Sequence, residues 1–186
     1  MEQPMMRRIK RELEHEGSIL DIYSDYMELP NGKIEKWDYV EHRKGAAAVI
    51  PVLPDGRVLL VRQYRNALER FTLEIPAGAR DSVTEPTIEC AARELEEETG
   101  YYCEKLEFLL SLRTTVAFCN EMVDVYAARD LVPSKQHLDD AEFIELVTYP
   151  LEELCEMIYQ GIIQDSKTVA AILAYKDKYG RNLDRK

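Results

Sequence analysis

The sequence is poor in the residues that build disulfide frameworks, structural zinc sites and histidine-dependent active sites. Its four cysteines lie at positions 90, 103, 119 and 155, without a Cys-x-x-Cys pair among them. Such scattered thiols predict neither a disulfide framework nor a zinc site, and we expect them in a reducing cytoplasm. The three histidines, His15, His42 and His137, have no partner at the spacing of a metal site or a catalytic triad, so we interpret them as ordinary surface or core residues.

Long hydrophobic runs and an excess of positive charge are also absent. The longest apolar run, AAAVIPVL at residues 46–53, is far shorter than the roughly 20 residues needed to span a bilayer. The 24 Lys and Arg residues are outnumbered by 35 Asp and Glu residues, which gives a formal net charge of -11. This balance argues against nucleic acid or an anionic membrane as a partner, since either needs a basic surface. With 186 residues, 46% of them hydrophobic, the chain fits one soluble domain with short extensions.

Strand-like and helical patterns follow one another irregularly along the chain. Strand-like segments, bounded by turn residues, lie at 46–53, 57–64, 71–75, 106–115, 122–128 and 143–149. Helical patterns occupy residues 86–99, 150–161 and 166–180, with Pro150 and Ser166 at expected helix starts and Gly100, Gly161 and Gly180 at expected ends. This order predicts an α/β sandwich with a mixed sheet, not a doubly wound parallel sheet.

The N-terminal part of the chain has weaker patterns than the rest. We divide the sequence into an N-terminal extension, residues 1–45, and a main domain, residues 46–186. Residues 5–14 hold two apolar residues four apart among charges, which predicts a short surface helix or a frayed tail. The segment LPNGKIEKW (29–37) has an Asn-Gly pair between strand-like segments, the strongest short signal for a β-hairpin.

The segment RELEEETG (93–100) places four glutamates within five positions of a predicted helix. Glu94, Glu97 and Glu98 are spaced i, i+3, i+4 and therefore share one face about a turn long. Converging carboxylates repel one another unless they bind a hard cation, and Mg²⁺ prefers oxygen ligands. Arg93, four residues before Glu97, is placed to pair with that carboxylate and to orient it.

The alternative interpretation of these glutamates is a solvated acidic face. Two neighbouring features favour a site instead. The preceding EIPAG segment puts a turn glycine, Gly78, after a strand and before the helix, as a strand-loop-helix phosphate or metal site requires. An apolar stripe beside the glutamates, formed by Ile88, Ala91 and Leu95, would hold the helix against the sheet.

The stretch GARDSVTEPTIECAARELEEETGY (78–101) resembles the Nudix box, the signature of the Nudix hydrolases, written G-x5-E-x7-R-E-U-x-E-E-x-G-U with U apolar. The matching residues are Gly78, Glu85, Arg93, Glu94, Leu95, Glu97, Glu98 and Gly100, with Tyr101 in the final apolar place. One difference is visible: six residues instead of five separate Gly78 from Glu85, so the loop before the helix is one residue longer.

This resemblance implies a Nudix α/β/α sandwich that hydrolyses a nucleoside diphosphate linked to another group. In the family, two or three Mg²⁺ or Mn²⁺ ions are held by box glutamates, here Glu94, Glu97 and Glu98. The backbone carbonyl before the box glycine, here that of Ala77, often joins them. Clustered cations stabilise charge on phosphoryl oxygens and lower the pKa of an attacking water, so no protein nucleophile is needed.

Outside the box, the sequence resembles the ADP-ribose pyrophosphatase branch over roughly residues 35–177, through the segments VRQYR, LEIPAG, DDAEFIEL and GIIQDSKTVAAI. The resemblance implies that Arg65 and Glu74 line the substrate cleft, although a surface charge at a strand end would also explain Arg65. It implies that Trp37 stacks on adenine, with a packing role in the core or at an interface equally open. Branch members are usually homodimers, so we expect residues 18–45 to form dimer surface.

The resemblance also implies that the group that activates water lies on a loop after the box. In HLDDAEFIEL, Glu142 directly precedes the apolar start of a predicted strand, as the corresponding glutamate does in relatives, and Asp140 is the second candidate. The alternative is a solvated acidic loop without a chemical role.

The expected reaction is metal-dependent hydrolysis of a nucleoside diphosphate sugar, with ADP-ribose, giving AMP and ribose 5-phosphate, as the first choice. A proline-glycine segment of many ADP-ribose hydrolases is replaced here by TVAFCNE (115–121), which leaves another nucleotide sugar or a dinucleotide open. A third interpretation is a non-catalytic Nudix domain that senses such a ligand. Sensor domains commonly lose box glutamates, and these are present here.

Overall fold

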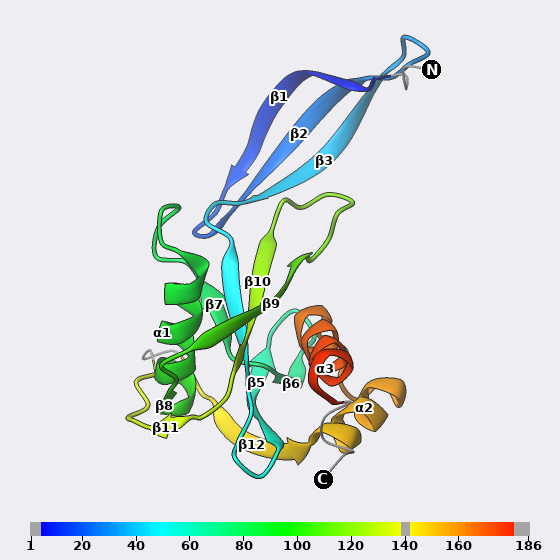
Figure 1. Cartoon of the computed structure of the whole chain (residues 1–186). Helices are drawn as coiled ribbons and strands as arrows, with labels where there is room; N and C mark the ends of the chain where they lie inside the picture. The colour runs from blue at the N-terminus through cyan, green and yellow to red at the C-terminus, as the bar shows by residue number, and fades with distance from the viewer. Residues whose placement is uncertain (1–4, 139–141, 181–186) are drawn as a thin grey trace.

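The computed structural model describes residues 5–138 and 142–180, in which four sheets and three helices are present (Figure 1). The central sheet has the order β7-β4-β10-β9. Its strands are β4 (Ala46–Pro51), β7 (Ala77–Ala79), β9 (Leu106–Arg113) and β10 (Met122–Ala128). β4 and β10 are parallel, whereas β7 and β9 run antiparallel to their neighbours. The mixed sheet predicted from the sequence is therefore confirmed.

The helices α1 (Thr87–Thr99), α2 (Leu151–Tyr159) and α3 (Ser166–Tyr179) occupy the three segments with helical patterns. α1 ends at Gly100, whose φ of 69° lies in the left-handed region that glycine adopts easily. α3 begins at Ser166, as predicted. The residue before it, Asp165, is the N-cap, and its carboxylate accepts a hydrogen bond from the backbone N–H of Thr168.

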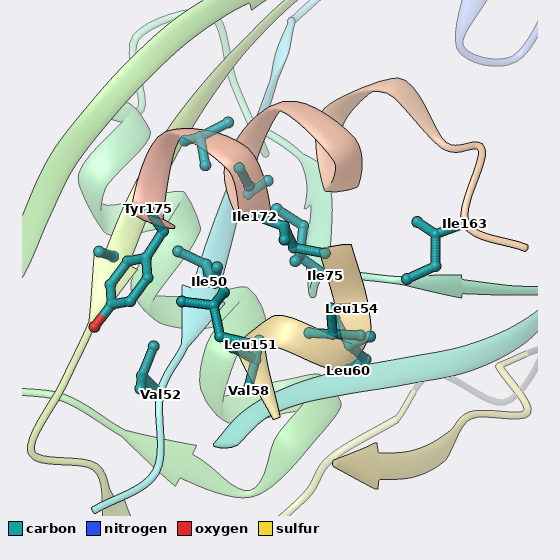
Figure 2. Close-up of a cluster of buried hydrophobic side chains, with 14 of the residues drawn as sticks. Ile50, Val52, Val58, Leu60, Ile75, Leu151, Leu154, Ile163, Ile172 and Tyr175 are labelled. Carbon is teal, nitrogen blue, oxygen red and sulfur yellow. The ribbon is translucent and has the colours of Figure 1, made fainter. Parts of the chain in front are cut away.

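Both faces of the central sheet are buried, because successive residues of its strands point to opposite sides. Val49 of β4 packs with Leu95 of α1 on one face, and Ile50 packs with Ile172 of α3 on the other. Figure 2 shows the second cluster, in which Leu154 of α2 joins Ile50 and Ile172. α1 and α3 therefore enclose the sheet, and the expected α/β/α sandwich is confirmed (Figure 1).

A second sheet, in the order β12-β5-β6, is entirely antiparallel. Its strands are β5 (Arg57–Arg65), β6 (Arg70–Glu74) and β12 (Glu145–Pro150), and each lies in a segment predicted as a strand. Only Ile75 and Pro76 separate β6 from β7, so the chain passes directly from this sheet to the edge of the central one. The end of β6 therefore leads directly into β7, the strand that contacts Glu94 and Glu98 of α1.

Two very short strands follow α1 and pair with each other: β8 (Tyr101–Tyr102) and β11 (Val132–Pro133). The sequence patterns predicted neither of them, nor the three-residue β7. Strands of two or three residues contain too few positions to show an alternation of apolar and polar side chains.

The N-terminal segment forms a separate antiparallel sheet of β1 (Arg7–Glu16), β2 (Leu20–Glu28) and β3 (Ile34–His42), with β2 in the centre. Figure 1 shows this sheet projecting beyond the central one. The turn between β2 and β3 contains Asn31 and Gly32, and the φ of Gly32 is 79°, so the predicted hairpin is confirmed.

The helix or frayed tail expected for residues 5–14 is wrong, because residues 7–16 form strand β1. β1 pairs with β2 along its length, but the register shifts between Arg8 and Lys10 and again between Leu13 and His15. Each shift places two successive residues opposite one and so interrupts the alternation that would identify a strand. The strand is fixed instead by contacts that a local pattern does not show, such as the two hydrogen bonds of 2.6 and 2.7 Å from Arg11 to Asp25 of β2.

The N-terminal sheet is joined to the main body through the loop that precedes β10. The backbone N–H of Val40 donates to the carbonyl oxygen of Phe118 (2.7 Å), and the N–H of His42 donates to Oδ1 of Asn120 (2.7 Å). Within the part of the chain that the structure describes, no helix is both long enough and apolar enough to cross a membrane.

Candidate active site

The glutamates of α1 lie on one face of the helix, next to the buried side that holds α1 against the sheet. Ala91 and Leu95 are fully buried, as expected, but Ile88 is exposed, so the predicted apolar stripe is shorter than three residues. Glu94 and Glu98 are buried as well, whereas the side chain of Glu97 retains 41% of its accessible surface. Two carboxylates of the box are thus withdrawn from water and the third is open to it.

Arg93 connects the glutamates to the neighbouring backbone. Its Nη1 donates to Oε1 of Glu94 (2.7 Å) and to Oε2 of Glu97 (2.9 Å), and its Nη2 donates to the carbonyl oxygen of Ala79 (3.1 Å). Nε lies 3.5 Å from Oε1 of Glu85. The pairing of Arg93 with Glu97 that the four-residue spacing predicted is present, and the same guanidinium also holds Glu94.

The buried carboxylates have strongly raised pKa values. Burial raises the pKa of Glu94 to about 7 even though Arg93 lowers it. Burial, together with the charge of Glu94, raises the pKa of Glu98 to about 8. The negative charge of Glu142 contributes to both increases, which brings this exposed side chain into the electrostatic surroundings of the box glutamates. One arginine does not compensate this group of carboxylates, and a divalent cation would.

The strand β7 lies directly against α1. The backbone N–H of Ala77 donates to Oε2 of Glu98 (3.1 Å). A Cβ atom on Gly78 would lie 2.2 Å from Oε1 of Glu94, so a side chain here would displace that carboxylate. The sequence predicts a turn at Gly78, but the residue belongs to β7 and its φ is not positive. The absence of a side chain at this position lets the strand and the Glu94 carboxylate lie next to each other.

The residues present suit a hard divalent cation by chemistry, since they offer carboxylate oxygens next to a backbone carbonyl. Among residues 5–138 and 142–180, no three His, Cys, Asp or Glu side chains are already arranged around a common metal position. Hydrogen bonds explain this arrangement: Arg93 holds Glu94 and Glu97, and the N–H of Ala77 holds Glu98. Rotation of these carboxylates about their side-chain bonds would be needed to bring the oxygens together.

The additional residue in the loop before α1 is accommodated within the loop itself. Nε of Arg80 donates to the carbonyl oxygen of Glu85 (2.8 Å), and Oε2 of Glu85 accepts a hydrogen bond from the backbone N–H of Asp81 (2.6 Å). These contacts close the loop while leaving Glu85 beside Arg93. The longer loop therefore leaves Glu85 in contact with Arg93.

Arg65 and Glu74, predicted from the resemblance to line the cleft, face each other at the ends of β5 and β6. Nε and Nη2 of Arg65 donate to Oε1 and Oε2 of Glu74 at 2.7 and 2.6 Å, and Thr72 donates to the same carboxylate at 2.7 Å. Lys167 of α3 is a further partner of Glu74. Burial alone would raise the pKa of Glu74, but Arg65 and Lys167 lower it to about 2.

Two hollows of about 410 Å³ each adjoin this ion-pair cluster. We call them the box cleft and the rear cleft. The box cleft is lined by Ile19, His42, Ala46, Arg65, Ala77, Gly78, Ala79, Thr114, Glu121, Val123, Asp165, Ser166 and Lys167. The rear cleft is lined by Arg65, Ala67, Leu68, Arg70, Thr72, Leu73, Glu74, Ile162, Gln164, Asp165 and Lys167. Arg65, Asp165 and Lys167 are common to both.

Lys167 and His42 are cleft residues that sequence reasoning missed. His42 was interpreted as an ordinary residue, yet it lines the box cleft with Nε2 3.7 Å from Oε1 of Glu121. Lys167 belongs to the segment GIIQDSKTVAAI, one of the segments that resemble the ADP-ribose pyrophosphatase branch. The sequence does contain one indication of a special role for Lys167: a basic residue in the first turn of a helix is unfavourable by itself.

Trp37 is not part of either cleft. It lies on β3, 44% exposed, in a separate hollow of about 610 Å³ with Ile22, Lys36, Asp38, Val40, Ala117 and Phe118. Within one chain the structure therefore does not bring Trp37 together with the box glutamates. Glu142 is described and exposed, whereas Asp140, the second candidate for the base, lies outside the described residues.

The three-layer fold, the carboxylate face of α1 and the adjoining cleft are the features of a hydrolase that acts on pyrophosphate bonds. The NUDIX domain matches residues 42–172, and the chain therefore belongs to the Nudix family. Two relatives are each 39% identical over 168 residues, covering 89% of this chain and 90% of the relative. They are the methanol dehydrogenase activator of Bacillus methanolicus and the ADP-ribose pyrophosphatase of Bacillus subtilis strain 168.

A solved crystal structure of an ADP compounds hydrolase has the same fold. It matches with a TM-score of 0.86 and 22% sequence identity over 95% of both chains. The chain is thus a Nudix hydrolase similar to ADP-ribose pyrophosphatases.

Proposed function

We propose that the protein hydrolyses the pyrophosphate bond of ADP-ribose, giving AMP and ribose 5-phosphate, with Mg²⁺ or Mn²⁺ as cofactor. The observation that carries the proposal is the pair of buried carboxylates, Glu94 and Glu98, beside a cleft to which Arg65 contributes its guanidinium. An anionic diphosphate would be repelled by these carboxylates unless cations lay between them. The 39% identity to an ADP-ribose pyrophosphatase supports the choice of substrate.

The residues of the box would hold the metal and keep its ligands in place. Glu94, Glu97, Glu98 and the carbonyl oxygen of Ala77 are the proposed ligands. Bound divalent cations polarise a phosphoryl group and make a water nucleophilic at neutral pH. Arg93 hydrogen-bonds to Glu94 and Glu97 and so keeps both carboxylates on one side of α1, from which they would rotate to bind a metal.

Glu142 is the proposed general base. Its negative charge contributes to the raised pKa of Glu94 and of Glu98, which supports a position in the surroundings of these carboxylates. It is exposed and precedes β12, a position from which a side chain can move over a bound substrate. Arg65 would bind a diphosphate oxygen, since a guanidinium donates to phosphate in a fixed planar geometry.

Residues 1–45 are the proposed dimerisation segment of a cytoplasmic homodimer. The N-terminal sheet leaves apolar side chains exposed on its strands: Ile9, Leu13, Leu20, Ile22, Ile34 and Trp37. A three-stranded sheet with that much exposed apolar surface is suited to packing against a second copy. Because Trp37 lies outside both clefts of its own chain, stacking on adenine would take place in the cleft of the partner subunit.

A second candidate substrate class is another nucleotide sugar or a dinucleotide. The segment that contains Val116 and Ala117 favours this alternative, because many ADP-ribose hydrolases have proline and glycine there. Val116 is exposed, and Ala117 lines the hollow of Trp37, so a difference in this loop would alter the surroundings of a stacked base. A non-catalytic sensing role is less well supported, because all three box carboxylates are present.

The test is a panel of nucleotide sugars and dinucleotides incubated with the protein and Mg²⁺ or Mn²⁺, with products separated by chromatography. The proposal predicts the highest kcat/KM for ADP-ribose and the two products AMP and ribose 5-phosphate. A higher kcat/KM for another compound would move the assignment to the second candidate class. No hydrolysis of any compound would contradict an enzymatic function.

A further inference from the structure

Lys167 occupies a position that is unfavourable for a lysine. It is the second residue of α3, where the helix dipole disfavours positive charge, and its side chain is only 13% exposed. An ammonium group that is largely removed from water needs partners that compensate for the lost hydration. A residue that violates local preferences in this way, at the boundary of two clefts, indicates a functional constraint.

The partners of Lys167 are two carboxylates. Its Nζ donates to Oε2 of Glu74 and to Oδ2 of Asp165 (3.0 Å). Glu74, 3% exposed in its side chain, also binds Nε and Nη2 of Arg65. The third nitrogen of Arg65, Nη1, makes no hydrogen bond within the described part of the chain, and Arg65 lines both clefts.

The four charges of this cluster, on Arg65, Lys167, Glu74 and Asp165, cancel formally. Without Lys167 the cluster would carry a net negative charge beside the carboxylates of α1. The field of Lys167 reaches that helix, because its charge lowers the pKa of Glu98 against the larger effects of burial and Glu94. In the absence of Lys167, a diphosphate that enters the box cleft would meet negative charge both from the cluster and from the carboxylates of α1.

Lys167 also belongs to a rigid connection between α3 and the strand segment that leads to the box. The next residue, Thr168, accepts a hydrogen bond from the backbone N–H of Ile75 at its Oγ1 (3.0 Å). Residues 74 and 75 are thus both held by the first turn of α3, two residues before Ala77. Displacement of this turn would move the end of β6 and the arginine attached to it.

We propose that Lys167 is a positioning residue for substrate binding: it neutralises and fixes Glu74, so that Arg65 is held through Nε and Nη2 and presents Nη1 to a phosphate oxygen. The inference rests on the proposed function, because it assumes a diphosphate substrate in the box cleft. Lys167 would contribute to binding of the substrate in its ground state without contacting the reacting atoms.

The test compares Lys167→Met with the wild-type protein in two measurements. With ADP-ribose and Mg²⁺, KM should rise about tenfold or more, because the variant would weaken the charge-assisted hydrogen bond from Arg65 to the phosphate. The value of kcat should stay within about twofold. In the presence of Mg²⁺, calorimetric titration with ADP should show a dissociation constant raised by a similar factor. Lys167→Arg should restore much of the loss, because it keeps the charge.

The control is Lys176→Met, which removes a lysine of the same helix that pairs with Glu152 on the exposed side. It should leave both measurements unchanged. A fall in kcat and melting temperature with unchanged KM in Lys167→Met would overturn the inference, because it would show a purely structural lysine. So would equal affinity of Lys167→Met and wild type for ADP. Absence of hydrolysis by the wild type, in contrast, would contradict the proposed function. The comparison of ADP affinities would still test whether Lys167 contributes to diphosphate binding.

Discussion

A Cβ atom added to Gly78 would lie 2.2 Å from Oε1 of Glu94 and 2.3 Å from its Cδ. The Glu94 carboxylate therefore lies so close to the backbone of the edge strand β7 that a side chain at position 78 would displace it. In this geometry the strand determines where the carboxylate lies. The box glycine and the first box glutamate of α1 thus act as one structural unit.

Gly78→Ala should consequently displace the Glu94 carboxylate and impair catalysis. A misplacement of about 1 Å in an active site can cost about 10²-fold in rate, so we expect a loss of kcat of that order together with weaker Mn²⁺ binding. The control is Gly56→Ala, where a Cβ meets nothing within 4 Å but φ is +84°. It should cost roughly 1–2 kcal/mol of stability and leave turnover unchanged. If Gly78→Ala lowers only the melting temperature, the close approach has no role in the site.

The ion-pair cluster around Glu74 should make stability depend on pH on the acid side. Its pKa is about 2 in the folded protein against an ordinary value of 4.5, so its contribution is complete above about pH 4.5 and is lost as pH falls toward 2. Urea unfolding of wild type and Glu74→Gln should therefore differ most near neutral pH and converge as pH falls below 4.5. A difference that stays constant down to pH 3 would contradict the assigned pairing.

Glu142→Gln should lower kcat by roughly 10²–10⁴-fold, the usual contribution of a general base. Mn²⁺ affinity and melting temperature should barely change, because the proposed metal ligands on α1 are intact and Glu142 is exposed. Glu145→Gln is the matched control, since it removes an exposed carboxylate three residues away that pairs with Arg62 (2.9 Å). Near-normal kcat in Glu142→Gln, or an equal loss in Asp140→Asn alone, would place the base elsewhere.

Trp37→Ala should raise KM more than it lowers kcat, because stacking holds the ground state and the transition state about equally. Stacking on a base is worth roughly 1–3 kcal/mol, which corresponds to a clear increase in KM. Ile34→Ala, another exposed apolar residue of β3, serves as the control. An unchanged KM with the oligomeric state preserved would assign Trp37 to packing.

The parts of the fold that could be predicted from the sequence are those with local signals. The bounds of α1 follow from its flanking residues, and the positions of Glu94, Glu97 and Glu98 follow from helical spacing alone. β1 could not be predicted, because its two register shifts remove the alternation and its stability comes from pairing with β2.

The candidate site shows the same division between local and distant contacts. Arg93 and Glu97 lie on one helix, so their pairing could be predicted from spacing. Lys167 and Glu74 are 93 residues apart, and only the packing of α3 against the end of β6 brings them together. The burial of Glu98 and the close approach at Gly78 likewise depend on how a strand and a helix pack, which no local pattern encodes.

The most direct test of the account is the metal-dependent turnover of ADP-ribose by Glu97→Gln and Glu98→Gln, measured alongside thermal melting without metal. If α1 binds the metal through these carboxylates, both variants should lose most turnover at every Mg²⁺ or Mn²⁺ concentration, with the fold intact. In Glu98→Gln the melting temperature near pH 8 should be equal to or higher than that of the wild type, because a buried carboxylate of raised pKa is replaced by a neutral group. Near-normal turnover in both variants would contradict the assignment of α1 as the metal-binding helix.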